Sequence, residues 1–136
     1  MVEEKTGKIL LVEDDDPFRL MLRKLIEGRF PLTSIEEASE GNEAMEKIKV
    51  FHPDLIFMDI RLTKGNGLVL TKEIKELYPQ AQVIVLTGFD LPEYREAALE
   101  SGASFFASKQ KSSAKDILEF VNTALSAGKG SPAGAG

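Results

Sequence analysis

The stretch ILLVEDDDP, residues 9–17, contains the pattern that decides the fold. Four apolar residues are followed directly by four acidic residues and a proline. A continuous apolar run of this length is typical of a parallel strand that is covered on both faces. Residues 55–58 (LIFM) and 83–86 (VIVL) repeat the apolar run, and residues 105–107 (FFA) form a shorter one. The segment 32–38 contains two glutamates, so we expect it to be a partly exposed edge strand.

Between these runs, apolar residues recur with helical spacing. Asp16 is expected to cap the first helix, Pro17 suits its first turn and Gly28 is expected to end it. The expected apolar stripes are Phe18, Met21, Leu22, Leu25 and Ile26; Ala44, Met45, Ile48 and Phe51; Leu70, Ile74 and Leu77; residues 92–101, ended by Gly102; and Ile117, Leu118, Val121 and Leu125. Strict alternation of strands and helices predicts an α/β fold, with helices on both faces of a parallel sheet.

The composition is that of an ordinary soluble domain, with 136 residues, 43% hydrophobic and 29% charged. A net charge of −5 argues against direct nucleic-acid binding by this chain, because such binding normally needs a basic face. The absence of cysteine excludes disulfides, and no apolar run is long enough for a membrane span. We therefore expect a cytoplasmic protein, with a polar tail at 1–7, one domain at 8–127 and a flexible tail or truncated linker at 128–136.

Polar side chains stand where several predicted strands end. Glu13 and Asp14 follow the first strand and Asp59 follows the third. Thr87 ends the fourth, and Lys109 follows the fifth. Ligands of open α/β sheets bind beyond the carboxyl ends of the strands, so we expect these side chains to share one site.

Clustered carboxylates at one site need a counter-charge. At ~4 Å and an effective dielectric constant near 20, two like charges repel by about 4 kcal/mol. A hard dication relieves this repulsion, and a site of oxygen ligands suits Mg²⁺. A carboxylate can also attack phosphorus and form an aspartyl phosphate, which needs positive charge and hydrogen-bond donors around it. The strand ends of this chain supply such groups.

Five segments of the chain resemble the receiver domain of two-component response regulators, over about residues 8–125. They are ILLVEDDDPFRLML (9–22), EASEGNEAMEKI (37–48), PDLIFMDIRLTKGNGL (53–68), VIVLTG (83–88) and GASFFASK (102–109). Each segment alone is a weak signal, whereas five in the family's order and spacing are specific. The resemblance implies a flavodoxin-like doubly wound α/β fold, with a five-stranded parallel sheet of order 2-1-3-4-5 and five helices.

The resemblance also implies a phosphorylation-dependent signalling switch, which catalyses only its own phosphorylation and dephosphorylation. Asp59 would accept a phosphoryl group from a partner histidine kinase or phosphotransfer protein, with Mg²⁺ as cofactor. The implied Mg²⁺ ligands are Asp14 directly, Glu13 through a water molecule, Asp59, and the backbone carbonyl of Arg61. The implied phosphate-binding and switch residues are Thr87, Gly88, Phe106 and Lys109. Arg61 and Phe89 would flank the phosphate and tune its lifetime.

The implied output surface is formed by the fourth helix, the fifth strand and the fifth helix, around residues 94–101 and 114–125. If Thr87 moves toward the phosphate, Phe106 can rotate into the space it leaves. Phe106 and Phe105 are adjacent in a strand and face opposite ways, so only one of them can rotate inward. The changed surface would bind a downstream effector or a second copy of the chain.

Three residues depart from the family's pattern. Thr63 replaces the usual proline after the phosphoacceptor, in a turn that Gly65 and Gly67 keep feasible. Gln110 replaces the proline after Lys109, so we expect a trans peptide there. Phe106 replaces a commoner tyrosine and lacks its hydroxyl, so its inward position should depend on packing alone.

Two other interpretations remain open. A phosphatase of the haloacid dehalogenase type also uses an aspartate nucleophile at a strand end, but it needs a second aspartate where this chain has Arg61. A degenerate receiver would act only as a docking module, and the complete set of acidic, hydroxyl and lysine side chains argues against this. The single histidine, His52, precedes a proline and is interpreted as structural.

Overall fold

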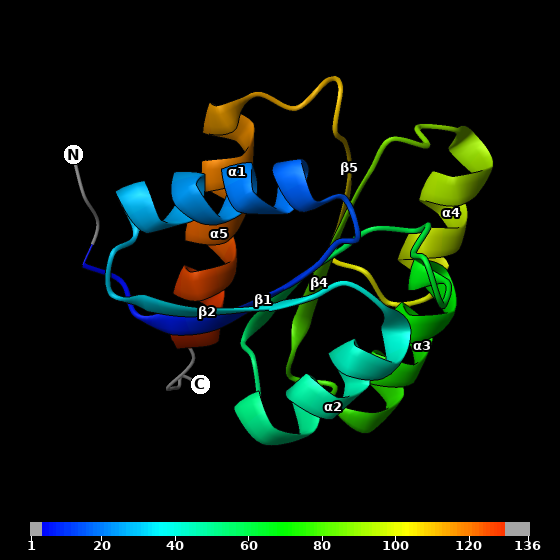
Figure 1. Ribbon diagram of the computed structural model, residues 1–136, viewed down its shortest axis with the longest axis horizontal. Helices are drawn as coiled ribbons and strands as arrows, with labels where there is room; N and C mark the ends of the chain where they lie inside the picture. The colour runs from blue at the N-terminus through cyan, green and yellow to red at the C-terminus, as the bar shows by residue number, and fades with distance from the viewer. Residues whose placement is uncertain (1–3, 130–136) are drawn as a thin grey trace.

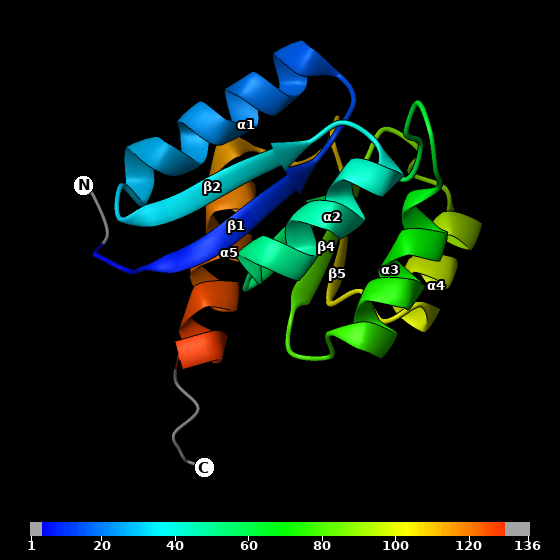
Figure 2. The ribbon, with the colours of Figure 1, turned by 60° about the horizontal axis from the view of Figure 1, so that its bottom comes forward.

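The computed structural model describes residues 4–129, which form a parallel sheet with helices on both faces (Figure 1). The strands are β1 (Gly7–Val12), β2 (Thr33–Ala38), β3 (Leu55–Met58), β4 (Gln82–Thr87) and β5 (Phe105–Ser108). The helices are α1 (Asp16–Arg29), α2 (Gly41–Phe51), α3 (Gly67–Leu77), α4 (Pro92–Glu100) and α5 (Ala114–Lys129). The strand order is β2-β1-β3-β4-β5, and β2 lies beside β1 at one edge in Figure 2. The predicted fold and strand order are confirmed.

Two hydrophobic cores lie on opposite faces of the sheet, because successive strand residues point to opposite sides. In β1, Leu10 and Val12 pack beneath α2, α3 and α4, whereas Ile9 and Leu11 pack beneath α1 and α5. The other central strands alternate in the same way, so each apolar quartet contributes to both cores. The polar residues that follow these quartets are thereby placed together at the carboxyl edge of the sheet.

The start of α1 differs from the prediction. Asp15, not Asp16, is the N-cap, and its carboxylate accepts a hydrogen bond from the backbone N–H of Phe18. Asp16 lies inside the first turn and pairs with Arg19 instead. Acidic residues suit both positions, so the side-chain contacts decide which one caps the helix.

Several other boundaries differ by a few residues. α1 continues past Gly28 to Arg29, because nothing forces that glycine into a left-handed conformation. Leu77 was expected to be buried but is 63% exposed at the end of α3. β1 begins at Gly7, and α5 runs to Lys129, beyond the expected domain boundary; the remainder of the expected tail lies outside the described residues. Within residues 4–129, no helix is both long and apolar enough to cross a membrane.

Candidate functional site

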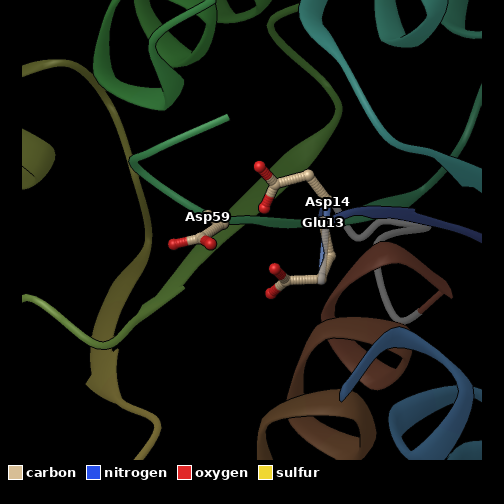
Figure 3. A group of neighbouring side chains, drawn as sticks. All are labelled: Glu13, Asp14 and Asp59. Carbon is tan, nitrogen blue, oxygen red and sulfur yellow. The ribbon is translucent and has the colours of Figure 1, made fainter. Parts of the chain in front are cut away.

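Three carboxylates meet at the ends of β1 and β3. Glu13 and Asp59 are nearly buried, with 3% and 6% exposure, and Asp14 is half-buried. Each residue offers one oxygen, and these oxygens lie within 4.8 Å of one another. Figure 3 shows Glu13 and Asp14 leaving the chain on opposite sides, with both carboxylates turned toward the side of Asp59. The predicted acidic residues are therefore brought together.

The backbone holds these residues in place through hydrogen bonds between neighbouring strand ends. The N–H of Asp59 donates to Val12 O at 3.1 Å, and that of Glu13 donates to Ala38 O at 2.9 Å. Gly67 lies directly behind Asp59, where an added Cβ would stand 2.0 Å from the Asp59 carbonyl oxygen. The predicted need for glycine here is explained by this close approach, while Gly65 is needed for its φ of +114°.

Lys109 supplies positive charge to the carboxylates. Its Nζ lies 2.7 Å from Glu13 Oε1 and 3.3 Å from Asp59 Oδ2. The same ammonium lies 4.5 Å from the centre of the Phe18 ring, which covers it from α1. The N–H of Lys109 donates to Thr87 O at 2.9 Å, so the end of β4 fixes where the lysine emerges.

Burial shifts the protonation equilibrium of Glu13 toward the neutral acid. Burial raises the pKa of Glu13 to about 7, with a further rise from Asp59, and the hydrogen bonds from Lys109 and from the Asp15 N–H offset part of this. Burial would lower the pKa of Lys109, but its contacts with Glu13 and Asp59 outweigh burial and raise it. Lys109 therefore remains an ammonium at neutral pH.

One oxygen of the phosphoacceptor candidate lacks a partner. Asp59 Oδ1 is buried and accepts no hydrogen bond from the described part of the chain. A buried carboxylate oxygen without a partner is costly, and three carboxylates share a single lysine. A small divalent cation with oxygen ligands would satisfy this oxygen and offset the excess negative charge. The residues present therefore fit Mg²⁺.

Thr87 and Gly88 lie at the end of β4, next to the site. The buried hydroxyl of Thr87 accepts a hydrogen bond from the N–H of Phe89 at 3.2 Å. Ser108, which ends β5, was not singled out from the sequence. Its hydroxyl accepts from the N–H groups of Gln110 and Lys111, both at 3.2 Å, and so shapes the turn after Lys109. The Lys109–Gln110 peptide is trans, as expected.

The two candidate lifetime residues contact each other. The guanidinium carbon of Arg61 lies 4.2 Å from the centre of the Phe89 ring, and Phe89 also makes an edge contact with Tyr94 of α4. The Arg61 backbone forms an isolated bridge with Asn66. The role of its carbonyl as a metal ligand remains a prediction.

The two phenylalanines of β5 face opposite ways, as expected. Phe106 is 6% exposed and belongs to the core beneath α4, whereas Phe105 is 37% exposed and packs on Phe120. The guanidinium of Arg95 lies over the Phe106 ring, 4.9 Å from its centre. In this structure a cation–π contact from α4 therefore adds to the packing of Phe106, and the expectation for its inward position stays a prediction.

The contacts of two residues near the site were not predicted from the sequence. Arg19 donates from Nη1 to the backbone oxygen of Glu13 at 2.6 Å, while its Nε pairs with Glu37 at 2.7 Å. Thr63 donates to Asp14 Oδ2 at 2.9 Å. The sequence marks Thr63 only as a substitution for proline, and the contacts of both residues join segments distant in the chain.

The sequence of this chain is similar to those of known proteins from one family. The chain matches the response regulator receiver domain over residues 9–122. It is 36% identical over 119 residues to the chemotaxis protein CheY of Halobacterium salinarum, covering 86% of this chain and 98% of that protein. It is 39% identical over 121 residues to the transcriptional regulatory protein LnrK of Bacillus subtilis, covering 89% of this chain but only 54% of LnrK.

Solved structures agree with the sequence relatives. A CheY-like receiver domain protein from Methanospirillum hungatei superposes with a TM-score of 0.83 at 25% identity, covering 94% of this chain and 98% of that one. A LuxR-family two-component response regulator from Aurantimonas gives a TM-score of 0.82 at 28% identity, covering 90% and 86%. With the same fold and a family match along most of its length, the chain belongs to the response regulator receiver domain family.

Proposed function

We propose that this chain is a phosphorylation-dependent switch, in which Asp59 accepts a phosphoryl group from a histidine kinase or a phosphotransfer protein. The observation that carries the proposal is the position of Asp59. Its carboxylate lies close to two further carboxylates and 3.3 Å from the ammonium of Lys109, and its buried Oδ1 has no partner within residues 4–129. Such a carboxylate is held beside positive charge and leaves one oxygen to a cation.

The transfer is a displacement at phosphorus. A carboxylate oxygen of Asp59 forms the new P–O bond while the P–N bond to the donor histidine breaks, and the ring nitrogen keeps the electron pair. Lys109, already 3.3 Å from Asp59, stays charged and offsets the negative charge that reaches the site. The hydroxyl of Thr87 and the N–H of Gly88 are the nearby candidate donors to the phosphoryl oxygens.

Mg²⁺ would be held by Asp14, by Asp59, by Glu13 through water and by the carbonyl of Arg61. When bound, it supplies positive charge that offsets the carboxylates and the phosphoryl oxygens. The ammonium of Lys109 already binds Glu13 Oε1 at 2.7 Å. This contact supports a water-mediated role for Glu13 at the metal, because one of its two oxygens is engaged.

The proposed output runs through Thr87 and Phe106. The phosphoryl group carries close to two negative charges in place of the single charge of the Asp59 carboxylate, and Lys109 and Thr87 can hold its oxygens best by moving toward Asp59. In this structure the Phe106 ring is buried against Arg95 of α4, and its rotation into the space that Thr87 leaves is the proposed second arrangement. Phosphate that favours one arrangement by about 5.5 kcal/mol changes its population from 1:99 to 99:1. The face formed by α4, β5 and α5 then changes, and binds an effector or a second copy.

Phosphorylation of the purified chain tests this proposal. With an acyl phosphate and Mg²⁺, the mass of the protein should rise by one phosphoryl group, and peptide mapping should place it on Asp59. Asp59→Asn or excess EDTA should abolish the gain, whereas Asp54→Asn, an aspartate before β3, should leave it unchanged. Equal labelling of the Asp59→Asn protein would mean that the site assignment is wrong.

The same experiment separates the alternative functions. A docking module would gain no phosphoryl group in wild-type form. A phosphatase would hydrolyse phosphoesters repeatedly, whereas a receiver would dephosphorylate only itself. We expect neither, because Lys109 and Asp59 are in contact and Arg61 stands where the phosphatase needs an acid.

A further inference from the structure

A hydrogen bond joins the two loops that carry the acidic residues. Thr63 Oγ1 donates to Asp14 Oδ2 at 2.9 Å, across 49 positions of sequence. Asp14 lies between β1 and α1, and Thr63 lies between β3 and α3, four residues after Asp59. The bond therefore ties a candidate metal ligand to the loop of the phosphoacceptor.

The loop that carries Thr63 is firmly held. At its base, the N–H of Gly67 donates to Ile60 O at 2.7 Å, and Arg61 forms a bridge with Asn66. On its outer side, the carbonyl of Lys64 accepts from the N–H of Gly41 at the start of α2, at 2.8 Å. A hydroxyl on a loop with these contacts has a defined position, so it can orient another side chain rather than follow it.

The backbone beside Asp14 is held independently of Thr63. Arg19 donates to the Glu13 carbonyl oxygen at 2.6 Å, and the Asp15 N–H donates to Glu13 Oε2 at 3.0 Å. These contacts place the main chain but leave the Asp14 side chain free to rotate. The hydrogen bond from Thr63 restricts that rotation and engages only one oxygen of the carboxylate, while the carboxylate stays with those of Glu13 and Asp59 (Figure 3).

We propose that Thr63 is a positioning residue for the metal ligand Asp14, an inference that rests on the proposed Mg²⁺ site. Groups that hydrogen-bond a ligating carboxylate fix its orientation before the metal arrives, and their removal typically weakens metal binding by about 10- to 100-fold. Thr63 and its loop are exposed, so water can replace part of the lost bond. We therefore expect a weakening of about 10-fold, at the lower end of that range.

Titration of the full chain with Mg²⁺, followed by NMR and by thermal unfolding, tests this role. Thr63→Val removes the donor and keeps the shape of the side chain, and should raise the Kd for Mg²⁺ about 10-fold. Thr63→Ser keeps the hydroxyl and should restore binding close to wild type. Thr33→Val, which removes the hydrogen bond from Thr33 Oγ1 to Phe30 O at the opposite edge of the sheet, is the matched control and should bind Mg²⁺ as the wild type does.

Two further measurements show whether Thr63 acts through Asp14. In an Asp14→Ala background, Thr63→Val should cause no additional loss of Mg²⁺ affinity. In metal-free protein, Thr63→Val should speed amide hydrogen exchange at residues 13–15, and Thr63→Ser should not. A general loss of structure would instead speed exchange throughout the chain and would not be rescued by serine.

The possible failures are distinguishable. If the wild type binds Mg²⁺ and Thr63→Val binds it equally well, the positioning role is wrong and the proposed metal site stands. An additive loss in the Asp14→Ala background would also overturn the positioning role. If the wild type shows no saturable response to Mg²⁺, the proposed metal site is wrong, and the inference about Thr63 falls with it.

Discussion

The β1–β3 side of the site and the β4–β5 side are built in different ways. On the first side, Glu13, Asp14 and Asp59 are held by backbone hydrogen bonds, by Arg19 and by Thr63. On the second, Phe106 is held by packing and by the exposed Arg95 of α4, a helix whose only buried residue is Ala98. Directional bonds fix a geometry, whereas a ring beneath a sparsely buried helix can adopt a second position. The proposed phosphoacceptor and metal ligands therefore lie on the rigid side, and the proposed response lies on the adjustable one.

The largest expected effect is on the rigid side, at Gly67. Gly67→Ala would place a Cβ 2.0 Å from the Asp59 carbonyl oxygen. We expect it to lower the free energy of unfolding by about 3 kcal/mol or more and to displace Asp59. Gly28→Ala, on the exposed surface of α1 with nothing within 4 Å of the added Cβ, should instead raise stability by up to about 1 kcal/mol. Urea unfolding of both variants measures the contrast, and equal stabilities would contradict it.

The next effect concerns Glu13 and pH. Its pKa is about 7 in the folded protein and is ordinarily 4.5, so the folded state binds a proton that the unfolded chain has released. In EDTA, the free energy of unfolding should therefore fall as pH rises from about 5 to about 8, by on the order of 2–3 kcal/mol. Glu13→Gln should flatten this dependence. Unfolding at several pH values provides the measurement, and a wild-type stability that rises with pH over this window would contradict the assignment.

Removing the metal and removing a ligand should have smaller effects on stability, and these two effects should be of opposite sign. Mg²⁺ should stabilise the wild type, because it binds the folded state preferentially. Asp14→Ala should raise metal-free stability by about 1 kcal/mol, since one of three clustered negative charges is gone, and should weaken stabilisation by Mg²⁺. Melting curves with Mg²⁺ and with EDTA test both effects; an unchanged Mg²⁺ response in Asp14→Ala would exclude its ligand role.

On the adjustable side, Arg95→Ala should cost little stability yet change the switch. The loss of one exposed cation–π contact is worth about 0.5–1 kcal/mol. Because this contact holds the Phe106 ring in its observed position, its removal should increase the population of the second ring position, which NMR of the ring resonances can detect. Arg29→Ala, which removes a similar contact with Phe30 at 5.9 Å, is the matched control and should leave Phe106 unchanged. An unaltered Phe106 spectrum in Arg95→Ala would show that packing suffices.

The smallest expected effect lies where the two sides meet, at Arg61 and Phe89. If their contact shields the site from water, Arg61→Ala and Phe89→Ala should each speed decay of the phosphoprotein about threefold, roughly 0.7 kcal/mol. Because the two side chains touch, the double variant should show less than the product of the single effects. Decay rates of phosphorylated protein provide the test; single variants that decay no faster than wild type would rule out shielding.

The sequence was informative wherever a local pattern had a single structural solution. Runs of apolar residues that end in polar residues predicted the strands. They also predicted the edge of the sheet at which Glu13, Asp59 and Lys109 meet. The helix caps were less certain, since Asp15 and Asp16 are chemically equivalent and only the contact with the Phe18 N–H distinguishes them. Leu77 fits the helical stripe of α3, but the stripe reaches solvent at the last turn.

By itself, the sequence determined the alternation of strands and helices, the strand ends that carry polar groups and the family to which the chain belongs. These features follow from residue order, because the strand and helix periods are local patterns in the sequence and their alternation implies a parallel sheet. Only the tertiary structure decided that Lys109 forms ion pairs with both Glu13 and Asp59. It also decided that Arg95 lies over the Phe106 ring and that Thr63 donates a hydrogen bond to Asp14. The physical reason is that these contacts join residues 11 to 96 positions apart, whose meeting depends on how the sheet and its loops pack.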